Sequence, residues 1–165
     1  MTVTTEALIA QRTATWTAEE RAALGAVVEA LRPSARHFTD ILDWLDDIAA
    51  RDRVRPAAAL ADPSLHTVLR FRGSQADRLK RWKERLRRLR YPRLAACESA
   101  IADLVRAMDL GGAIAVAPPP ALEGGLVTFT IAARSTDELA AAVARLSDHI
   151  ARGDVDRLFA LLDEA

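Results

Sequence analysis

The element around which this chain is organised lies at residues 74–93, SQADRLKRWKERLRRLRYPR. Its large apolar residues are spaced three, four and three apart, as Leu79, Trp82, Leu86 and Leu89. This spacing predicts an amphipathic helix from Gln75 to Arg90, about 24 Å long at 1.5 Å per residue, with Ser74 as its N-cap. Pro92 lacks an amide donor and disfavours helical geometry at Tyr91. We therefore expect a kink or corner there, followed by a second helix.

Most of the basic charge of the chain is concentrated in the same segment. Residues 70–93 contain eleven Lys and Arg residues, opposed only by Asp77 and Glu84, so this window carries a net charge of +9. Because the whole chain is neutral, the remaining residues together carry −9. A concentrated positive field needs an anionic partner, which is either another part of the chain or another molecule.

The basic helix predicts a non-enzymatic protein that binds DNA or RNA through residues 74–93. Arg and Lys along such a helix can neutralise several phosphates and release their counterions. Contacts of this kind supply affinity more than sequence specificity. Trp82 lies on the apolar seam, so we expect it in the core and not stacked on a base. The predicted phosphate contacts are Arg78, Arg81, Lys83, Arg85, Arg87, Arg88 and Arg90.

Three other interpretations of the basic helix remain open. It can be a solvated surface without a partner, or it can dock on an acidic protein as part of an interaction or assembly module. It can also match an acidic face within the chain, formed on residues 35–51 by Asp40, Asp43, Asp46 and Asp47. Exposed ion pairs contribute only about 0–1 kcal/mol each. Four aspartates cannot neutralise a window of +9, so we expect positive charge to remain exposed.

The N-terminal part of the chain predicts further helices. Thr17-Ala-Glu-Glu20 is a capping box, and the helix that it opens ends at Pro33. Residues 54–72 are broken by two prolines into short segments. Residues 41–60 faintly resemble a helix-turn-helix, in which Arg55 would be the obvious phosphate contact. An ordinary helix corner is the preferred interpretation, because the second helix would be short and poor in base-reading side chains.

The C-terminal part predicts a helix, two strands and two more helices. The apolar runs at 113–117 and 126–132 predict a two-stranded antiparallel unit, and Ser135-Thr-Asp-Glu138 is a second capping box. The fold class is therefore α+β and predominantly α-helical, with about seven helices. We expect an N-terminal helical region at 1–72 and a basic helix with a small α+β module at 73–165, together forming one compact domain. Two strands alone are marginal, so a homodimer that joins sheet edges is one solution.

Several classes of function are disfavoured by the sequence. The histidines are scattered, Cys97 is the single cysteine, and the chain has no P-loop, GxGxxG or GxSxG motif, so we expect no catalytic site, metal or cofactor. Three aspartates within residues 43–47 could bind a divalent cation, but a solvated acidic face is the preferred interpretation. No apolar run approaches the roughly 20 residues that span a bilayer. We expect a cytoplasmic protein without a membrane partner.

Overall fold

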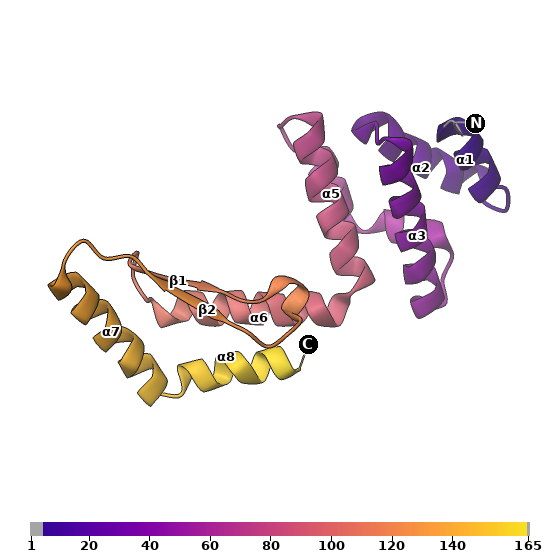
Figure 1. The fold of residues 1–165 in the computed structure, drawn as a ribbon. Helices are drawn as coiled ribbons and strands as arrows, with labels where there is room; N and C mark the ends of the chain where they lie inside the picture. Colours follow the sequence, from indigo (N-terminus) through magenta and orange to yellow (C-terminus); the bar gives the residue numbers. More distant parts are fainter. Residues whose placement is uncertain (1–4, 165) are drawn as a thin grey trace. The chain divides into compact units, whose positions relative to one another are not determined.

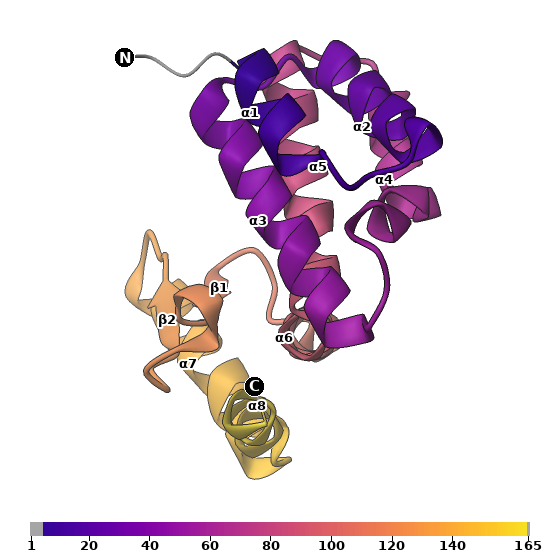
Figure 2. The ribbon, with the colours of Figure 1, turned by 90° about the vertical axis from the view of Figure 1, so that its right-hand side faces the viewer.

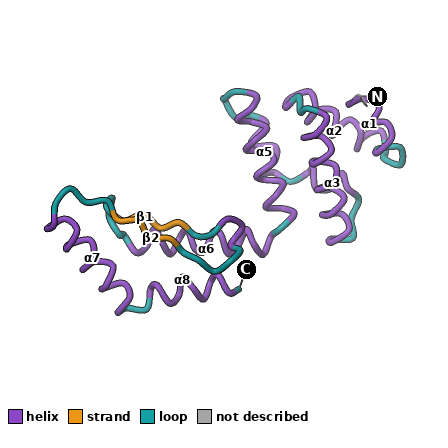
Figure 3. The backbone as a smooth tube through the Cα atoms, in the orientation of Figure 1, coloured by secondary structure: helices purple, strands orange, loops and turns teal. Residues whose placement is uncertain are grey.

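The computed structural model describes residues 5–164, with side chains from Ile9 onward (Figure 1). It is mainly helical, with one two-stranded antiparallel sheet before the last two helices, which confirms the predicted fold class (Figure 3). The chain divides into two compact units, the first ending at Tyr91 and the second beginning at Pro92. This division differs from the boundary expected at residues 72/73, because the basic helix belongs to the first unit.

The first unit is entirely helical in its described part. Its elements are α1 (Thr5–Arg12), α2 (Ala18–Leu31), α3 (Ala35–Asp52), the 3-10 helix η1 (Pro56–Ala61), α4 (Pro63–Leu69) and α5 (Gln75–Arg90). The predicted caps are present. The amide of Glu20 donates to Thr17 Oγ1 over 3.2 Å and the Thr17 amide donates to Glu20 Oε2 over 2.7 Å, which completes the capping box. The Asp77 amide likewise donates to Ser74 Oγ and starts α5 as expected.

Helix α5 contributes two of the largest buried side chains of this unit. Trp82 and Leu86 are fully buried, and they pack in one core with the apolar residues of α2, α3 and α4. Helices α3 and α5 run alongside each other (Figure 2). Asp40 pairs with Lys83, and residue 47 with residue 90, so the two helices run in the same direction with a constant offset of 43 positions. The narrow apolar seam of α5 is thus a core-facing seam.

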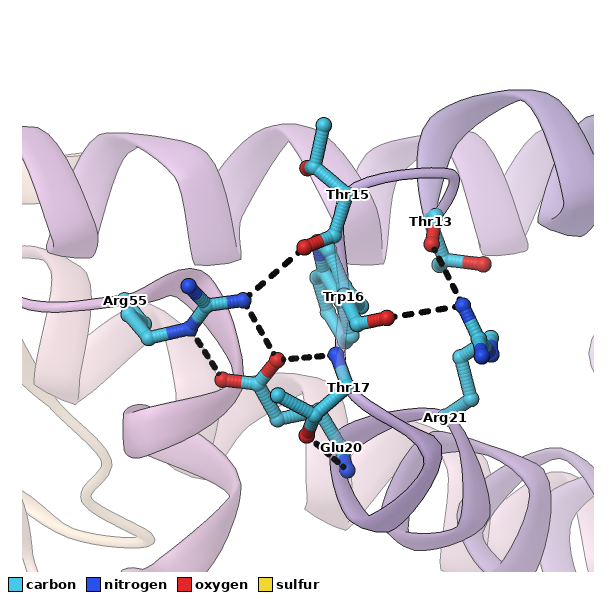
Figure 4. Close-up of polar contacts among 7 residues, drawn as sticks. All are labelled: Thr13, Thr15, Trp16, Thr17, Glu20, Arg21 and Arg55. Atoms are coloured by element: carbon cyan, nitrogen blue, oxygen red, sulfur yellow. Dashed lines mark hydrogen bonds and ion pairs between the residues drawn. The ribbon is translucent and has the colours of Figure 1, made fainter.

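The corner after α3 is not a helix-turn-helix. Arg53 adopts a left-handed conformation (φ 57°) at the end of α3, and the following element is the 3-10 helix η1 rather than a recognition helix. The Arg55 side chain forms an ion pair with Glu20 and donates to the Thr15 carbonyl oxygen over 3.0 Å (Figure 4). Hydrogen bonding by Arg55 lowers the pKa of Glu20 to about 2. Arg55 therefore joins η1 to the start of α2 and is not a free phosphate contact.

The second unit contains the sheet. Its elements are α6 (Pro92–Met108), β1 (Ile114–Ala117), the 3-10 helix η2 (Pro120–Leu122), β2 (Thr128–Ile131), α7 (Thr136–Ala151) and α8 (Asp154–Asp163). The strands pair antiparallel as expected, with Ile114 opposite Ile131 and Ala117 opposite Thr128. They are shorter than the predicted runs. One further backbone hydrogen bond, from the Ala132 amide to the Ala113 oxygen over 2.8 Å, extends the pairing beyond β1 and β2.

The core of the second unit lies between α6, the sheet and α8. Ile101, Leu104 and Met108 of α6 pack with Leu158 and Leu162 of α8 in one buried cluster. Ile114 of β1 is buried in the same cluster, and Val116, Phe129 and Ile131 of the strands lie half-buried against it. Cys97 is half-buried at the edge of this cluster. The helix expected after Pro92 therefore contributes one side of this core.

Helix α7 begins at the predicted cap, Ser135. The Glu138 amide donates to Ser135 Oγ over 3.2 Å, which is one half of the expected capping box. The Glu138 carboxylate instead accepts from the amide of Arg134 over 2.7 Å. Gly153 takes a positive φ of 78° between α7 and α8, a conformation that glycine adopts without steric cost.

Candidate nucleic-acid interface

The seven predicted phosphate contacts all lie on α5, but the structure distributes them over different sides of the helix. One side of α5 faces α3, and on another side Glu84 forms ion pairs with arginines of α5 itself. A third side borders an open hollow beside α4. The seven residues are Arg78, Arg81, Lys83, Arg85, Arg87, Arg88 and Arg90.

Lys83 and Arg90 face the acidic helix α3. Lys83 Nζ lies 2.6 Å from Asp40 Oδ2, and Arg90 Nη2 lies 2.5 Å from Asp47 Oδ2. The hydrogen bond from Lys83 lowers the pKa of the Asp40 carboxyl. Only 18% of the Lys83 side chain is exposed. These two cations therefore form ion pairs with the acidic helix, as one of the interpretations of the sequence allowed. They are poorly placed to bind a phosphate.

Trp44 of α3 strengthens this side of the contact. Lys83 Nζ lies 5.0 Å from the centroid of the Trp44 ring, and Arg90 Cζ lies 5.7 Å from it. A cation within about 6 Å of an indole face is attracted by the ring quadrupole. The two cations thus share one aromatic ring as well as two carboxylates. This side of α5 holds the helix in the first unit.

The other two aspartates of the acidic face are engaged elsewhere. Arg12 of α1 donates to Asp43 over 3.0 Å and to Asp46 over 2.5 Å, and these carboxylates raise the pKa of Arg12. Half of the acidic face therefore binds α1 and cannot cover the remaining charge of α5. Only Asp40 and Asp47 of this face pair with α5, so α5 keeps an excess of positive charge, as expected.

Glu84 binds two arginines within α5 itself. Its carboxylate accepts from Arg87 Nε over 3.0 Å and from Arg88 Nε over 3.4 Å. Hydrogen bonding from Arg87 lowers the pKa of Glu84. Pairs of this type, three or four residues apart on a helix surface, contribute about 0.2–0.5 kcal/mol. They are weak enough to exchange with a phosphate.

The open side of α5 carries Arg81, Arg85 and Arg88, at positions i, i+4 and i+7. The three side chains line a hollow of about 340 Å³, together with Thr67, Val68, Phe71 and Glu84. Arg81 Cζ lies 4.3 Å from the centroid of the Phe71 ring, and the Phe71 residue is 39% exposed. Within the described part of the chain, neither Arg81 nor Arg85 forms an ion pair. This hollow joins open guanidinium groups to an exposed aromatic ring.

Arg78 is the least accessible of the predicted contacts. Its side chain is half-buried, and its Nε is enclosed without a hydrogen-bond partner among the residues that the structure describes. The indole Nε1 of Trp82, one turn further along α5, is in the same situation. At least one donor of Arg78 thus points into the unit and is not available to a ligand in solution.

Two residues near this surface were not among the predicted contacts. Lys80 is exposed and borders a second hollow, of about 370 Å³, which also includes Trp44, Leu79 and Arg87. Phe71 contributes the aromatic surface of the first hollow. The sequence contains a signal for Phe71, because it stands between Arg70 and Arg72 at the start of the basic window. An aromatic residue among basic residues is typical of single-strand binding surfaces.

Other kinds of site are not assembled in the described residues. No group of three His, Cys, Asp or Glu side chains comes together there as a metal site would require. No helix within residues 5–164 combines the length and apolar character needed to cross a bilayer. His149 is buried, with Nδ1 2.7 Å from Asp154 Oδ2, and this pair joins α7 to α8. Comparisons of the chain with protein-family models, curated proteins and solved structures find no match.

Proposed function

We propose that the protein binds nucleic acid through the open side of α5, with Arg81, Arg85 and Arg88 as the phosphate contacts. The observation that carries this proposal is the shared hollow, in which three guanidinium groups lie on one exposed face. The proposal is narrower than the seven contacts expected from the sequence. Lys83 and Arg90 hold the contact with α3, the Nε–H of Arg78 is enclosed in the first unit, and Arg87 binds Glu84.

The geometry of the three arginines suits a sugar–phosphate backbone. Arg81 and Arg88 are seven residues apart, which is about 10.5 Å along the helix axis. A duplex carries one phosphate charge per about 1.7 Å of its axis when both strands are counted, so a length of about 10.5 Å lies beside several phosphates. The planar guanidinium fork matches phosphate oxygens in a bidentate manner. The surface is thus long enough to contact more than one phosphate.

This mode of binding involves no chemical step and reads no base edge. Phosphate contacts position a protein on DNA or RNA without carrying sequence information. The protein we propose is therefore non-enzymatic and has affinity for nucleic acid of mixed sequence. The homodimer expected from the sequence is part of the same proposal, since two copies would present two basic helices to one strand and bind it with higher avidity.

The test is a binding titration against labelled mixed-sequence DNA and RNA at several salt concentrations. We expect affinity that falls steeply with salt, and its loss in the variant Arg81→Glu, Arg85→Glu, Arg88→Glu. A charge-matched control changes three exposed arginines away from the hollow to Glu, namely Arg36, Arg53 and Arg134. Equal loss in both variants would show that only net charge matters. No binding by the folded wild-type protein at low salt would overturn the proposal and favour an acidic protein partner.

A further inference from the structure

The apolar stripe of α7 lies on the surface of the second unit. Leu139, Val143 and Ile150 are 45%, 48% and 54% exposed, and Leu146 is half-buried. These four residues are the stripe that the sequence provides for packing, at spacings of four, three and four. In the other helices of this unit the corresponding stripe points into the core. Leu146 packs against the core cluster of the unit, whereas Leu139, Val143 and Ile150 form an apolar face that the described part of the unit leaves largely uncovered.

A different side of α7 attaches it to its unit. Ala142 and His149 are its buried residues, and α7 packs on α8. His149 is also held by Asp154 at the start of α8. At 100° per residue, these two positions lie beside the apolar stripe and not on it. Leu139, Val143 and Ile150 thus remain exposed while α7 stays in place.

The open side of this stripe has a composition suited to close helix packing. The four residues that flank it there are Ala140, Ala144, Ser147 and Ala151, and all are exposed. Small residues at a helix surface allow another helix to approach closely. The charged residues Asp137, Glu138, Arg145 and Asp148 fall on the remaining side of the helix. The apolar stripe and the neighbouring stripe of small residues together form an uncharged exposed face. An acidic or basic partner would find no complementary charge on it.

The spacing of the face is compatible with a second copy of α7 as its occupant. Both stripes are spaced four, three, four, a sequence that is the same when read from either end of the helix. Two copies of α7 packed antiparallel would place Leu139 of one copy opposite residue 150 of the other, and Val143 opposite residue 146. The second half of the contact then repeats the first. A two-fold interface requires a self-complementary patch of this kind.

We propose that two copies of the chain associate through this face of α7, with the two α7 helices antiparallel. This assigns the dimer contact to α7 and not to the edges of the two-stranded sheet. It specifies the contact of the homodimer in the proposed function, but its test does not require nucleic-acid binding by the first unit. A 16-residue helix is about 24 Å long and about 10 Å wide, so each copy contributes about 240 Å², less than the ~800 Å² of a standard interface. We therefore infer a concentration-dependent dimer.

Sedimentation velocity of the full chain between about 1 and 200 µM tests the proposal. The expected result is a rise from monomer to dimer mass, with Val143→Glu raising the dimer dissociation constant at least about a hundredfold, because the interface would enclose unpaired carboxylates. Ala141→Glu is the matched control, since it adds the same charge to the exposed opposite side of α7. Far-UV circular dichroism establishes that both variants keep their helices. A monomer at all concentrations, or a dimer that Val143→Glu leaves intact, would overturn the proposal.

Disulfide cross-linking tests the antiparallel arrangement. In a Cys97→Ser background, Leu139→Cys and Ile150→Cys are expected to cross-link to each other when mixed, and neither to itself. In the antiparallel pair, position 139 is about 16.5 Å from its own copy on the partner, whereas a disulfide needs Cα atoms within about 7 Å. Efficient self-cross-linking of Leu139→Cys would show parallel helices and overturn this arrangement. Absence of any cross-link between the two variants would count against the α7 contact itself.

Discussion

Lys83 Nζ lies 2.6 Å from Asp40 Oδ2, and this contact joins the basic helix to the acidic helix. It separates the cations of α5 into those that hold the helix and those that remain open. Lys83 is largely covered and its charge is matched within the first unit, whereas Arg85, two positions further along, is exposed and has no ion pair among the described residues. Position on the helix, more than the number of basic residues, decides which side chains can meet a phosphate.

The first prediction follows from this separation. Lys83→Met keeps the aliphatic part of the side chain and removes the charge, so it should lower the unfolding free energy by about 1 kcal/mol or less, since Asp40 is partly exposed. Nucleic-acid affinity should stay within about twofold of wild type. All three tryptophans lie in the first unit, so urea unfolding followed by tryptophan fluorescence reports on this unit alone. A loss of affinity as large as that of an Arg85 variant would place the binding surface on the α3 side.

Arg85→Ala should have the opposite effects, with unchanged stability and reduced affinity for nucleic acid. Arg85 is exposed and packs in no core, so unfolding is expected to be unchanged within about 0.5 kcal/mol. Affinity for mixed-sequence DNA should fall about tenfold, the value of one charge-assisted hydrogen bond, and the slope of log affinity against log salt should fall by about one. Arg36→Ala is the matched control, because Arg36 is an exposed arginine of the same unit away from the hollow. An unchanged salt slope in Arg85→Ala would remove Arg85 from the interface.

Glu84 opposes ligand binding in the same hollow. Its carboxylate accepts hydrogen bonds from Arg87 and Arg88 and lies among the residues that line the arginine surface. Glu84→Gln removes one negative charge from the path of a phosphate and releases Arg88, so affinity should rise about two- to fivefold at 0.1 M salt. The same titration measures it. Lower affinity in this variant would mean that Glu84 is needed to orient the arginines.

The ion pair between Glu20 and Arg55 predicts an acid-sensitive contribution to stability. Arg55 holds the pKa of Glu20 at about 2, below its ordinary value of 4.5. Because the folded-state pKa is the lower one, the contribution is complete above about pH 4.5 and is lost as the pH falls towards 2. Glu20→Gln should therefore be less stable than wild type at pH 7, and the difference should shrink between pH 4.5 and 2. Urea unfolding across this range measures it, with the neighbouring exposed Glu19→Gln as the control.

Local signals predicted the helices well. Caps such as Ser74 and Thr17, together with apolar spacing and Pro92, place the ends of α2 and α5 where the structure has them, because these signals act within one or two turns. The antiparallel pairing of the two strands was also predicted correctly. The charge pattern also allowed the basic helix to pair with the acidic face of residues 35–51, as one of several interpretations.

What depended on tertiary packing could not be predicted. The sequence shows four aspartates on α3, but only the structure shows that Asp43 and Asp46 bind Arg12 while the other two bind α5. The apolar stripe of α7 has the same spacing as a core stripe, so its exposure could not be inferred from its pattern. Phe71 joins the arginine surface only because α4 packs against α5.

The position of the boundary between the units gives the last prediction. Trp82 and Leu86 of α5 are fully buried in the core of the first unit, so a fragment of residues 1–72 lacks side chains whose loss individually costs about 2–5 kcal/mol. That cost is comparable to the whole stability of a small unit. We expect fragment 1–91 to unfold cooperatively in urea and fragment 1–72 to show no cooperative transition. In the full chain, Leu86→Ala should lower the unfolding midpoint of the tryptophan signal, whereas Leu158→Ala, in the core of the second unit, should leave it unchanged. Cooperative folding of fragment 1–72 would show that α5 is not required for the first unit to fold, and would support a boundary at residues 72/73.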